Sequence, residues 1–209
     1  MNNTSLIYIH DPMCSWCWGF EPVRQQLFEA VADKMQIRRL VGGLAPDSDL
    51  PMPLEMQKGL QQTWQHIAEV IPGTRFNHAF WSDCAPRRST YPSNRAVIAA
   101  RQQGEEFDPL MSARIQKAYY LEARNPSDNS TLIELADEIG LDAGRFADSL
   151  ASEATHSLLL DEIASCRAMG VDSFPSLVVE HNGKQRHVQV NYTRLEIMLQ
   201  PIEEAIASL

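Results

Sequence analysis

The sequence predicts an α/β fold in which strands open and close the chain and helices fill its middle. Apolar runs over Leu6–His10 and Ile37–Val41 flank a helical pattern, and two β runs lie near the C-terminus. Between them, residues 51–169 show helical patterns without strand patterns. The expected order is β-α-β, a large all-helical insertion, and β-β-α. We therefore expect residues 1–50 and 170–209 to form one domain that carries the inserted helical subdomain.

The N-terminal unit follows from its local patterns. Asp11-Pro12 ends the first strand, and apolar residues from Val23 to Met35 then recur at helical spacing. Pro22 falls inside the first turns of this helix, where we expect a kink. Gly42-Gly43 ends the second strand. This β-α-β order predicts a parallel strand pair joined by a right-handed crossover.

Six helices are expected in the insertion. A capping box at Thr131 opens the fourth, and Gly140 closes it. Phe76–Ser93 is expected to be a polar loop. The expected helices cover Leu54–Ile71, Asn94–Gln103, Pro109–Ala123, the segment from Thr131, Asp142–Leu150, and a segment with Leu158, Leu159, Ile163 and Cys166 on one face.

A hairpin and a helix are predicted for the C-terminal unit. Asn182-Gly183 lies between the β runs Ser176–Glu180 and Arg186–Val190, which is a strong hairpin signal. The final helix is marked by an apolar stripe of Leu195, Met198, Leu199, Ile202, Ile206 and Leu209.

Composition narrows the class of protein. The 209 residues are 44% hydrophobic and 22% charged, which is ordinary for a globular chain. The net charge of −9 argues against nucleic acid or an anionic membrane as a partner. No window approaches the length of a transmembrane helix, and the first strand begins too early to leave room for a signal peptide. We therefore expect a cytoplasmic protein, and we expect a monomer because nothing in the sequence resembles a dimerisation segment.

The motif with the clearest chemistry is Cys14-Ser15-Trp16-Cys17, at the predicted start of the first helix. A helix N-terminus favours a thiolate, which is the nucleophile of disulfide exchange. One cysteine can attack, and the other can release the mixed disulfide. The alternative is half of a zinc site, which needs two further ligands. Cys84 and Cys166 are isolated in sequence, so we favour redox chemistry and expect neither a metal nor a cofactor.

A second signal is Ser173-Phe174-Pro175-Ser176, directly before the third strand. Proline cannot donate to the sheet ladder, so it is suited to the start of a strand. The Phe174–Pro175 bond at such a turn is a candidate cis peptide bond.

Together these features resemble the thioredoxin fold, and the helical insertion resembles its DsbA-like branch. The local sequence from Asp11 to Phe20 is similar to that of cytosolic bacterial members described as protein-disulfide isomerases or FrnE-like proteins. The resemblance implies that Cys14 is the nucleophile and Cys17 the resolving cysteine. It also implies a cis Pro175 beside the disulfide, with the backbone of Phe174 pairing with a bound peptide.

Three departures from the family pattern affect these expectations. Phe174 stands where the family usually has a smaller residue, and Ser-Trp replaces the Pro-His of strongly oxidising members, so we expect a less oxidising disulfide. The first strand contains no acid to act as a buried proton acceptor, and Asp11 and Glu21 are the nearest candidates. Trp16 and Trp18 would form an apolar rim that grips substrates.

The sequence leaves three functions open. The leading hypothesis is a thiol–disulfide oxidoreductase or isomerase acting on disulfide-containing proteins or on small disulfides such as glutathione. The alternative is an adaptor that presents proteins to a Clp-type protease, as some DsbA-like relatives do. A glutathione-dependent transferase or isomerase is the third, but such proteins usually carry serine at the position of Cys14.

Arg87-Arg88 and His10 have two interpretations each. Arg87-Arg88 either binds a carboxylate such as that of glutathione or is a solvated pair. His10 either acts on Cys14 as a nearby cation or is a hydrogen-bonded structural residue. Cys84 is expected to be a free thiol without a role, Cys166 a small buried hydrophobe, and Trp64 a core or lid residue.

Overall fold

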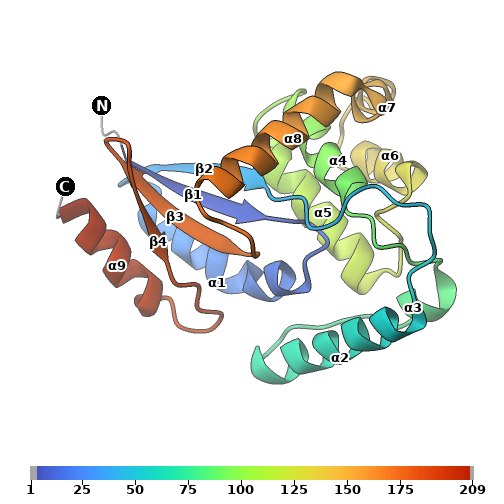
Figure 1. The fold of residues 1–209 in the computed structure, drawn as a ribbon, viewed down its shortest axis with the longest axis horizontal. Coiled ribbons are helices and arrows are strands. Elements are labelled where there is room, and N and C mark those ends of the chain that lie inside the picture. The colour runs from blue at the N-terminus through green and yellow to red at the C-terminus, as the bar shows by residue number, and fades with distance from the viewer. Residues whose placement is uncertain (1–3, 208–209) are drawn as a thin grey trace.

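A four-stranded mixed sheet forms the frame of the molecule in a computed structural model that describes residues 4–207. The strand order is β2-β1-β3-β4 (Figure 1). Strand β1 pairs in parallel with β2 and antiparallel with β3, and β4 pairs antiparallel with β3. The predicted parallel pair and hairpin are therefore confirmed. The strands are β1 (Thr4–His10), β2 (Gln36–Val41), β3 (Ser176–His181) and β4 (Lys184–Val188).

Helices cover both faces of this sheet. On one face, α1 (Ser15–Val31) and α9 (Glu196–Ala207) pack on alternate strand residues, and α1 runs continuously through Pro22. On the other face, Ile7 and Val178 meet Cys166 of α8 (Glu153–Ala168). Strand β1 is buried along its whole length because it is covered on both faces. Leu209 of the predicted final stripe lies outside the described residues.

The two-residue turn of the β3–β4 hairpin matches its sequence. Asn182 and Gly183 both have positive φ, at 48° and 77°. Tight two-residue hairpins need this conformation at both central positions, and Asn-Gly adopts it at low cost.

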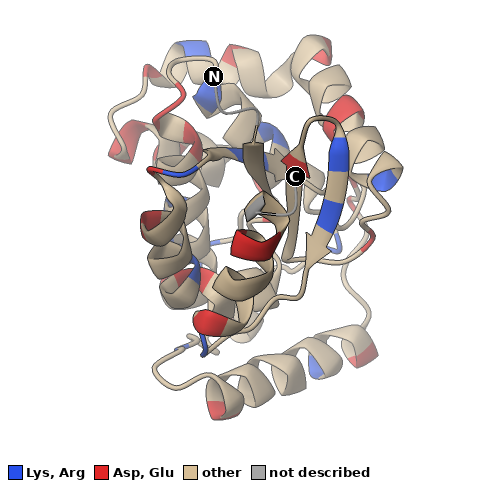
Figure 2. Cartoon of the chain, turned by 90° about the vertical axis from the view of Figure 1, so that its left-hand side faces the viewer, with Lys and Arg blue, Asp and Glu red and all other residues tan. Residues whose placement is uncertain are grey.

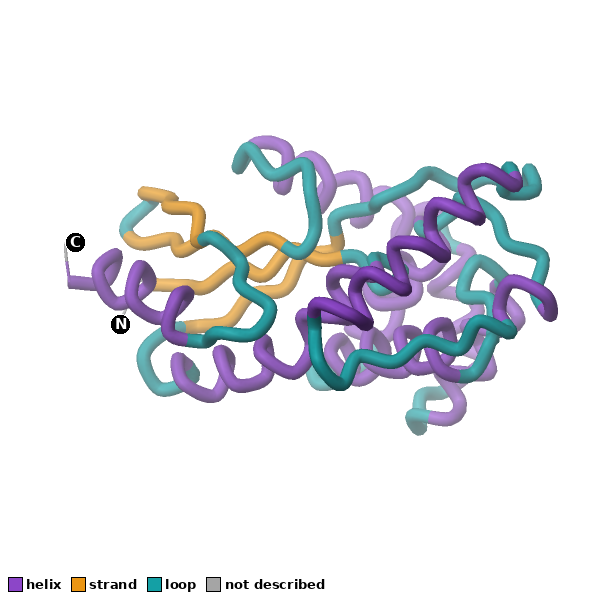
Figure 3. The backbone as a smooth tube through the Cα atoms, turned by 90° about the horizontal axis from the view of Figure 1, so that it is seen from below, coloured by secondary structure: helices purple, strands orange, loops and turns teal. Residues whose placement is uncertain are grey.

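Helices α2 to α8 all lie between β2 and β3 in sequence, as predicted for the insertion. Figure 3 shows the strands gathered at one end of the molecule and most helices at the other. Three details differ from expectation. A short helix, α3, interrupts the predicted polar loop, and α4 begins at Tyr91, inside that loop. Helix α6 begins before Thr131, so the capping box predicted there is wrong. The bounds are α2 (Leu54–Val70), α3 (Phe80–Asp83), α4 (Tyr91–Arg101), α5 (Phe107–Leu121), α6 (Asn129–Glu138) and α7 (Ala143–Ala151).

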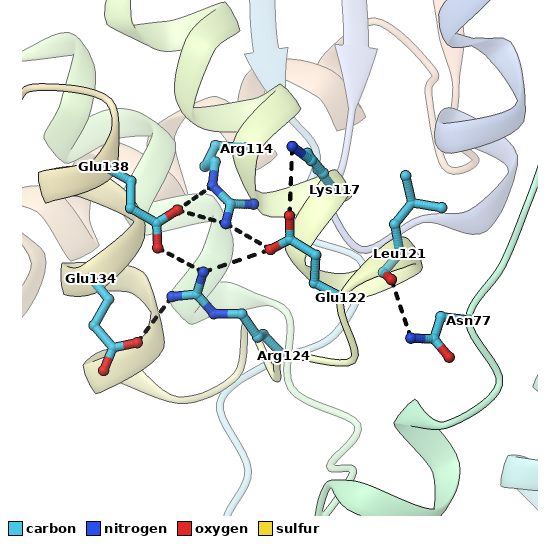
Figure 4. Close-up of polar contacts among 8 residues, drawn as sticks. All are labelled: Asn77, Arg114, Lys117, Leu121, Glu122, Arg124, Glu134 and Glu138. Atoms are coloured by element: carbon cyan, nitrogen blue, oxygen red, sulfur yellow. Dashed lines mark hydrogen bonds and ion pairs between the residues drawn. The ribbon is translucent and has the colours of Figure 1, made fainter.

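The helical part has its own apolar core, built from α4 to α8 and closed by Val41 of β2. At its surface Arg114 and Arg124 join Glu122, Glu134 and Glu138 in one ion-pair network between the end of α5 and α6 (Figure 4). Ion pairs at a surface contribute little each, so we take the apolar core as the main source of stability here.

Helix α2 is held by an aromatic cluster, defined as Trp64, Phe76, Phe80, Tyr119 and Tyr120. The side chain of Trp64 is 0% exposed, and its ring lies 5.0 Å from that of Phe76 and 5.4 Å from that of Tyr120, centroid to centroid. The cluster thus connects α2 to α3 and α5, as expected for a core tryptophan.

Charges are mixed over the surface. Helix α2, at the bottom of Figure 2, carries both acidic and basic residues. Within residues 4–207 no helix has the length and apolarity needed to cross a membrane.

Replacing Trp64 by alanine removes the centre of the aromatic cluster. We expect the free energy of unfolding to fall by about 3–5 kcal/mol, because a large buried side chain is lost and a cavity is left. Urea unfolding followed by circular dichroism measures this change. Leu54→Ala is the matched control on the same helix, since Leu54 is 72% exposed, and an equal loss in both variants would contradict the assignment.

A candidate thiol site at the start of the first helix

Local backbone structure places the cysteine pair at the N-terminus of α1. The turn after β1 closes with a hydrogen bond from the Cys14 N–H to the Asp11 carbonyl, at 3.0 Å. Cys14 is the N-cap residue, with extended φ and ψ of −81° and 116°, and its carbonyl accepts the Trp18 N–H at 3.1 Å. Cys17 lies one turn further, inside the helix.

The two thiols differ in their access to solvent. Cys14 is 7% exposed and lines a cavity of about 310 Å³, whereas Cys17 is 0% exposed. Both are free thiols, and Cys14 Sγ donates to the carbonyl oxygen of Phe174 at 3.3 Å. A molecule that enters the cavity therefore meets Cys14 first.

Their electrostatic environments also differ. A hydrogen bond from the Cys17 thiol lowers the pKa of Cys14, backbone N–H groups of Cys17 and Trp16 add to this, and burial opposes it. The pKa of Cys17 is raised well above its ordinary value, first by burial and then by its interactions with Cys14. The reachable thiol is thus the one more readily ionised, while its buried neighbour keeps its proton.

The carboxylate of Asp11, 0% exposed, binds the loops around this pair. It accepts the backbone N–H groups of Met13 and Leu44, each at 2.8 Å. It also accepts the Thr90 hydroxyl and the Asn94 amide, each at 2.7 Å. We call this arrangement the Asp11 clamp. Burial raises the pKa of Asp11, and the four hydrogen bonds counteract this rise.

Neither acid expected as a proton acceptor is free. The oxygens of Asp11 are occupied by the clamp, and Glu21 is bound by Arg24, whose Nε lies 2.7 Å from Glu21 Oε2. Both carboxylates thus have other donors as their partners.

The Phe174–Pro175 peptide bond is cis, as the sequence suggested. The ring of Phe174 lies over Gly42, where an added Cβ would be 2.0 Å from a ring carbon. A large residue therefore fits before the proline because position 42, at the end of β2, has no side chain. Phe174 packs against the apolar cluster of Ile7, Ile9 and Cys166, and its carbonyl oxygen accepts the Cys14 thiol.

The two tryptophans of the motif have different surroundings. Trp16 lines the cavity and packs against Tyr192, with ring centroids 5.1 Å apart. Trp18 stacks on Tyr120 of the aromatic cluster at 5.6 Å and donates its indole N–H to the Arg75 carbonyl at 3.0 Å. Trp18 is not among the cavity-lining residues. The structure therefore brings Trp16 and Phe174 to the cavity and turns Trp18 toward the helices.

His10 is not a cation beside Cys14, and that interpretation is wrong. Burial, followed by Arg24, Arg39 and Arg101, lowers the pKa of His10 to about 3, so the ring is neutral at neutral pH. The ring stacks on Tyr8 at 4.8 Å, and its Nε2 has no hydrogen-bond partner within the described chain.

The other two cysteines lie apart from the motif. Cys166 is buried under the sheet, as expected for a small hydrophobe, and Cys84 donates to the Ala123 carbonyl at 3.0 Å. Both are free thiols. Across residues 4–207 no group of three or more His, Cys, Asp or Glu side chains is placed to hold a metal ion.

Several residues of the site gave no sequence signal. The cavity draws on the loop before α2, α2 itself, the segment before α4, and α5, which are distant in sequence. Its lining consists of Met13, Cys14, Ser15, Trp16, Leu44, Met52, Leu60, Thr63, Arg87, Arg88, Thr90, Tyr119, Asp172, Ser173 and Phe174.

Comparison with known proteins agrees with this architecture. The chain is 26% identical over 172 residues to the ClpXP adapter protein SpxH of Halalkalibacterium halodurans. The matched region covers 80% of this chain and 56% of that protein. The chain thus spans little more than half the length of this relative.

Two solved structures share nearly the whole fold. A proposed protein disulfide isomerase from Nitrosomonas europaea has a TM-score of 0.86 at 24% identity, covering 99% of this chain and 98% of that one. The cytosolic disulfide reductase DsbM from Pseudomonas aeruginosa has a TM-score of 0.79 at 23% identity, covering 98% and 100%. It has also been solved with GSH.

The family model described as thioredoxin matches residues 7–200, which is almost the entire chain. The cysteine motif at the start of α1, the cis proline before β3 and the helical insertion all lie within this match. The chain belongs to the thioredoxin family and has the fold of its DsbA-like members.

Proposed function

We propose that this protein is a thiol–disulfide oxidoreductase whose reactive pair is Cys14 and Cys17. The observation that carries the proposal is the asymmetry of the pair. Cys14 reaches the cavity and has a lowered pKa, whereas Cys17 lies buried behind it with a raised one. This is the arrangement needed for an attacking thiolate and a resolving thiol.

The reaction consists of two exchanges. The Cys14 thiolate attacks one sulfur of a substrate disulfide, forms a mixed disulfide and releases the other sulfur as a thiolate. Cys17 then loses its proton and attacks Cys14, which forms the Cys14–Cys17 disulfide and releases the second thiolate. The substrate gains the two electrons that the protein dithiol loses, and the reverse sequence oxidises a substrate dithiol.

Disulfide-containing proteins and small disulfides such as glutathione are the proposed substrates, and the cytoplasm is the proposed location. The likeness to a cytosolic disulfide reductase solved with GSH supports both. We assign substrate contact to Trp16 and the backbone of Phe174, which line the cavity, with Pro175 fixing the segment beside them. We also propose that the protein can isomerise the disulfides of a protein substrate.

A redox titration against glutathione tests the proposal. We expect one reversible two-electron transition of Cys14–Cys17, between roughly −120 and −270 mV. Thiol trapping followed by mass spectrometry measures the oxidised fraction. Cys14→Ala and Cys17→Ala should each abolish the transition, while Cys84→Ala should leave it unchanged. A pair that cannot be oxidised would overturn the proposal.

The pH dependence of alkylation tests the cause of the low Cys14 pKa. Iodoacetamide reacts with the thiolate, so the rate rises as the pH passes the pKa. For Cys14 we expect the midpoint below about 8.5, the value of a free cysteine.

Variants at position 17 test how much the hydrogen bond from Cys17 lowers the pKa of Cys14. Cys17→Ala removes the S–H donor and should raise the midpoint, whereas Cys17→Ser keeps a donor and should hold it lower. Equal midpoints in the two variants would show that the hydrogen bond does not lower the pKa.

A protease adaptor is the second candidate, favoured by the match to SpxH. Two exposed apolar side chains on either side of Met52 in sequence, Leu50 at 76% and Leu54 at 72%, suit a protein-binding role. An adaptor should keep its partner when both thiols are replaced by alanine. An oxidoreductase should lose covalent capture of its substrate under the same change.

A further inference from the structure

Arg88 is a half-buried cation on the wall of the cavity that contains Cys14. Its guanidinium forms no ion pair and no hydrogen bond with the residues that the structure describes. It lies close enough to Tyr119, another lining residue, for its charge to oppose the rise that burial causes in the pKa of that phenol. Its five N–H donors are thus available to a molecule in the cavity.

Most other partly buried arginines of the described chain have a carboxylate partner, and Arg39, which has none, lies over the ring of Phe28 at 5.3 Å. Arg87, the neighbouring lining residue, donates to Asp128 at 2.6 Å and to the Ser127 carbonyl at 2.8 Å. Arg101 donates to Asp108 at 2.8 Å. Arg88, by contrast, has no carboxylate partner among the described residues, although the chain has a net charge of −9. An anionic ligand would supply the missing partner.

The cavity limits what this ligand can be. A volume of about 310 Å³ lies at the small end of the range for small-molecule sites. A guanidinium fork binds a carboxylate through two parallel hydrogen bonds. Asp172, on the segment before the cis proline, also lines the cavity and offers a partner for an ammonium group. Carboxylate and ammonium groups beside a sulfur atom are the features of a short cysteine-containing peptide.

We propose that Arg88 binds a carboxylate of a small peptide disulfide and thereby presents its sulfur to Cys14. The substrate class is a small, carboxylate-bearing disulfide rather than a folded protein. This inference rests on the proposed redox function of Cys14. In the reaction, glutathione disulfide gains two electrons and leaves as two thiols, while the protein dithiol becomes the Cys14–Cys17 disulfide.

A single-turnover experiment tests the inference. The reduced protein is mixed with glutathione disulfide, which carries carboxylates, or with hydroxyethyl disulfide, which is uncharged. Quenching by alkylation followed by mass spectrometry gives the second-order rate constant for each. The variants are Arg88→Gln, Arg88→Lys and a matched control, Arg145→Gln, which removes an equal charge from an exposed position on α7 outside the cavity lining.

We expect Arg88→Gln to lower the rate constant for glutathione disulfide by about tenfold or more, the value of one charge-assisted contact. The rate constant for hydroxyethyl disulfide should not change. Arg88→Lys should recover part of the loss, and Arg145→Gln should affect neither. In the unmodified protein, only the reaction with glutathione disulfide should slow at high ionic strength.

Three different results would overturn the inference, and each has its own meaning. Equal losses with both disulfides would show that Arg88 acts on Cys14 or on the fold. No loss with either would show that it does not contact substrate. If the unmodified protein reacts with neither disulfide, the proposed function fails and this inference fails with it.

Discussion

The Asp11 carboxylate is the constraint on which the thiol site depends. It joins the turn before Cys14, the loop after β2 and the start of α4 through four hydrogen bonds. Hydrogen bonds to a charged group contribute about 1.5–3 kcal/mol each, and a buried charge is costly without them. The Ala45 carbonyl also accepts the N–H groups of Thr90 and Tyr91, so Asp11 adds the turn before Cys14 to a connection that already joins the loop after β2 to the start of α4.

A second connection links the helical part to the motif itself. Trp64, at the centre of the aromatic cluster, donates its indole N–H to the hydroxyl of Ser15 at 3.0 Å. Ser15 lies between the two cysteines, so α2 contacts the cysteine motif directly. Together with the Asp11 clamp, this bond means that the insertion forms part of the site. The thioredoxin-like part supplies the thiols and the cis proline, and the helical part supplies much of the cavity wall.

Much of the fold could be predicted because its signals are local. The strands, the hairpin at Asn182-Gly183 and the long helices each follow from periodicity or turn chemistry within a few residues. Cys14 and Pro175 could also be recognised, because each lies in a short motif.

The remainder depends on partners distant in sequence. The donors of the clamp include Leu44 and Asn94, and no local pattern links either to Asp11. One of the two interpretations of His10 made it a cation, but burial lowers its pKa and keeps the ring neutral. The unpaired state of Arg88 also appears only when its surroundings are known. The burial of His10 and the lack of a partner for Arg88 both depend on how distant segments pack together. Composition and motif spacing therefore do not reveal them.

The most direct test of the redox account is covalent trapping on Cys17→Ala. This variant keeps the attacking thiol and removes the thiol that would release the substrate. Incubation with glutathione disulfide, followed by peptide mapping with mass spectrometry, identifies the modified cysteine. The account predicts one stable glutathione adduct, on Cys14, with Cys84 and Cys166 unmodified. An adduct on Cys84 with Cys14 still free, or no adduct at all, would contradict it.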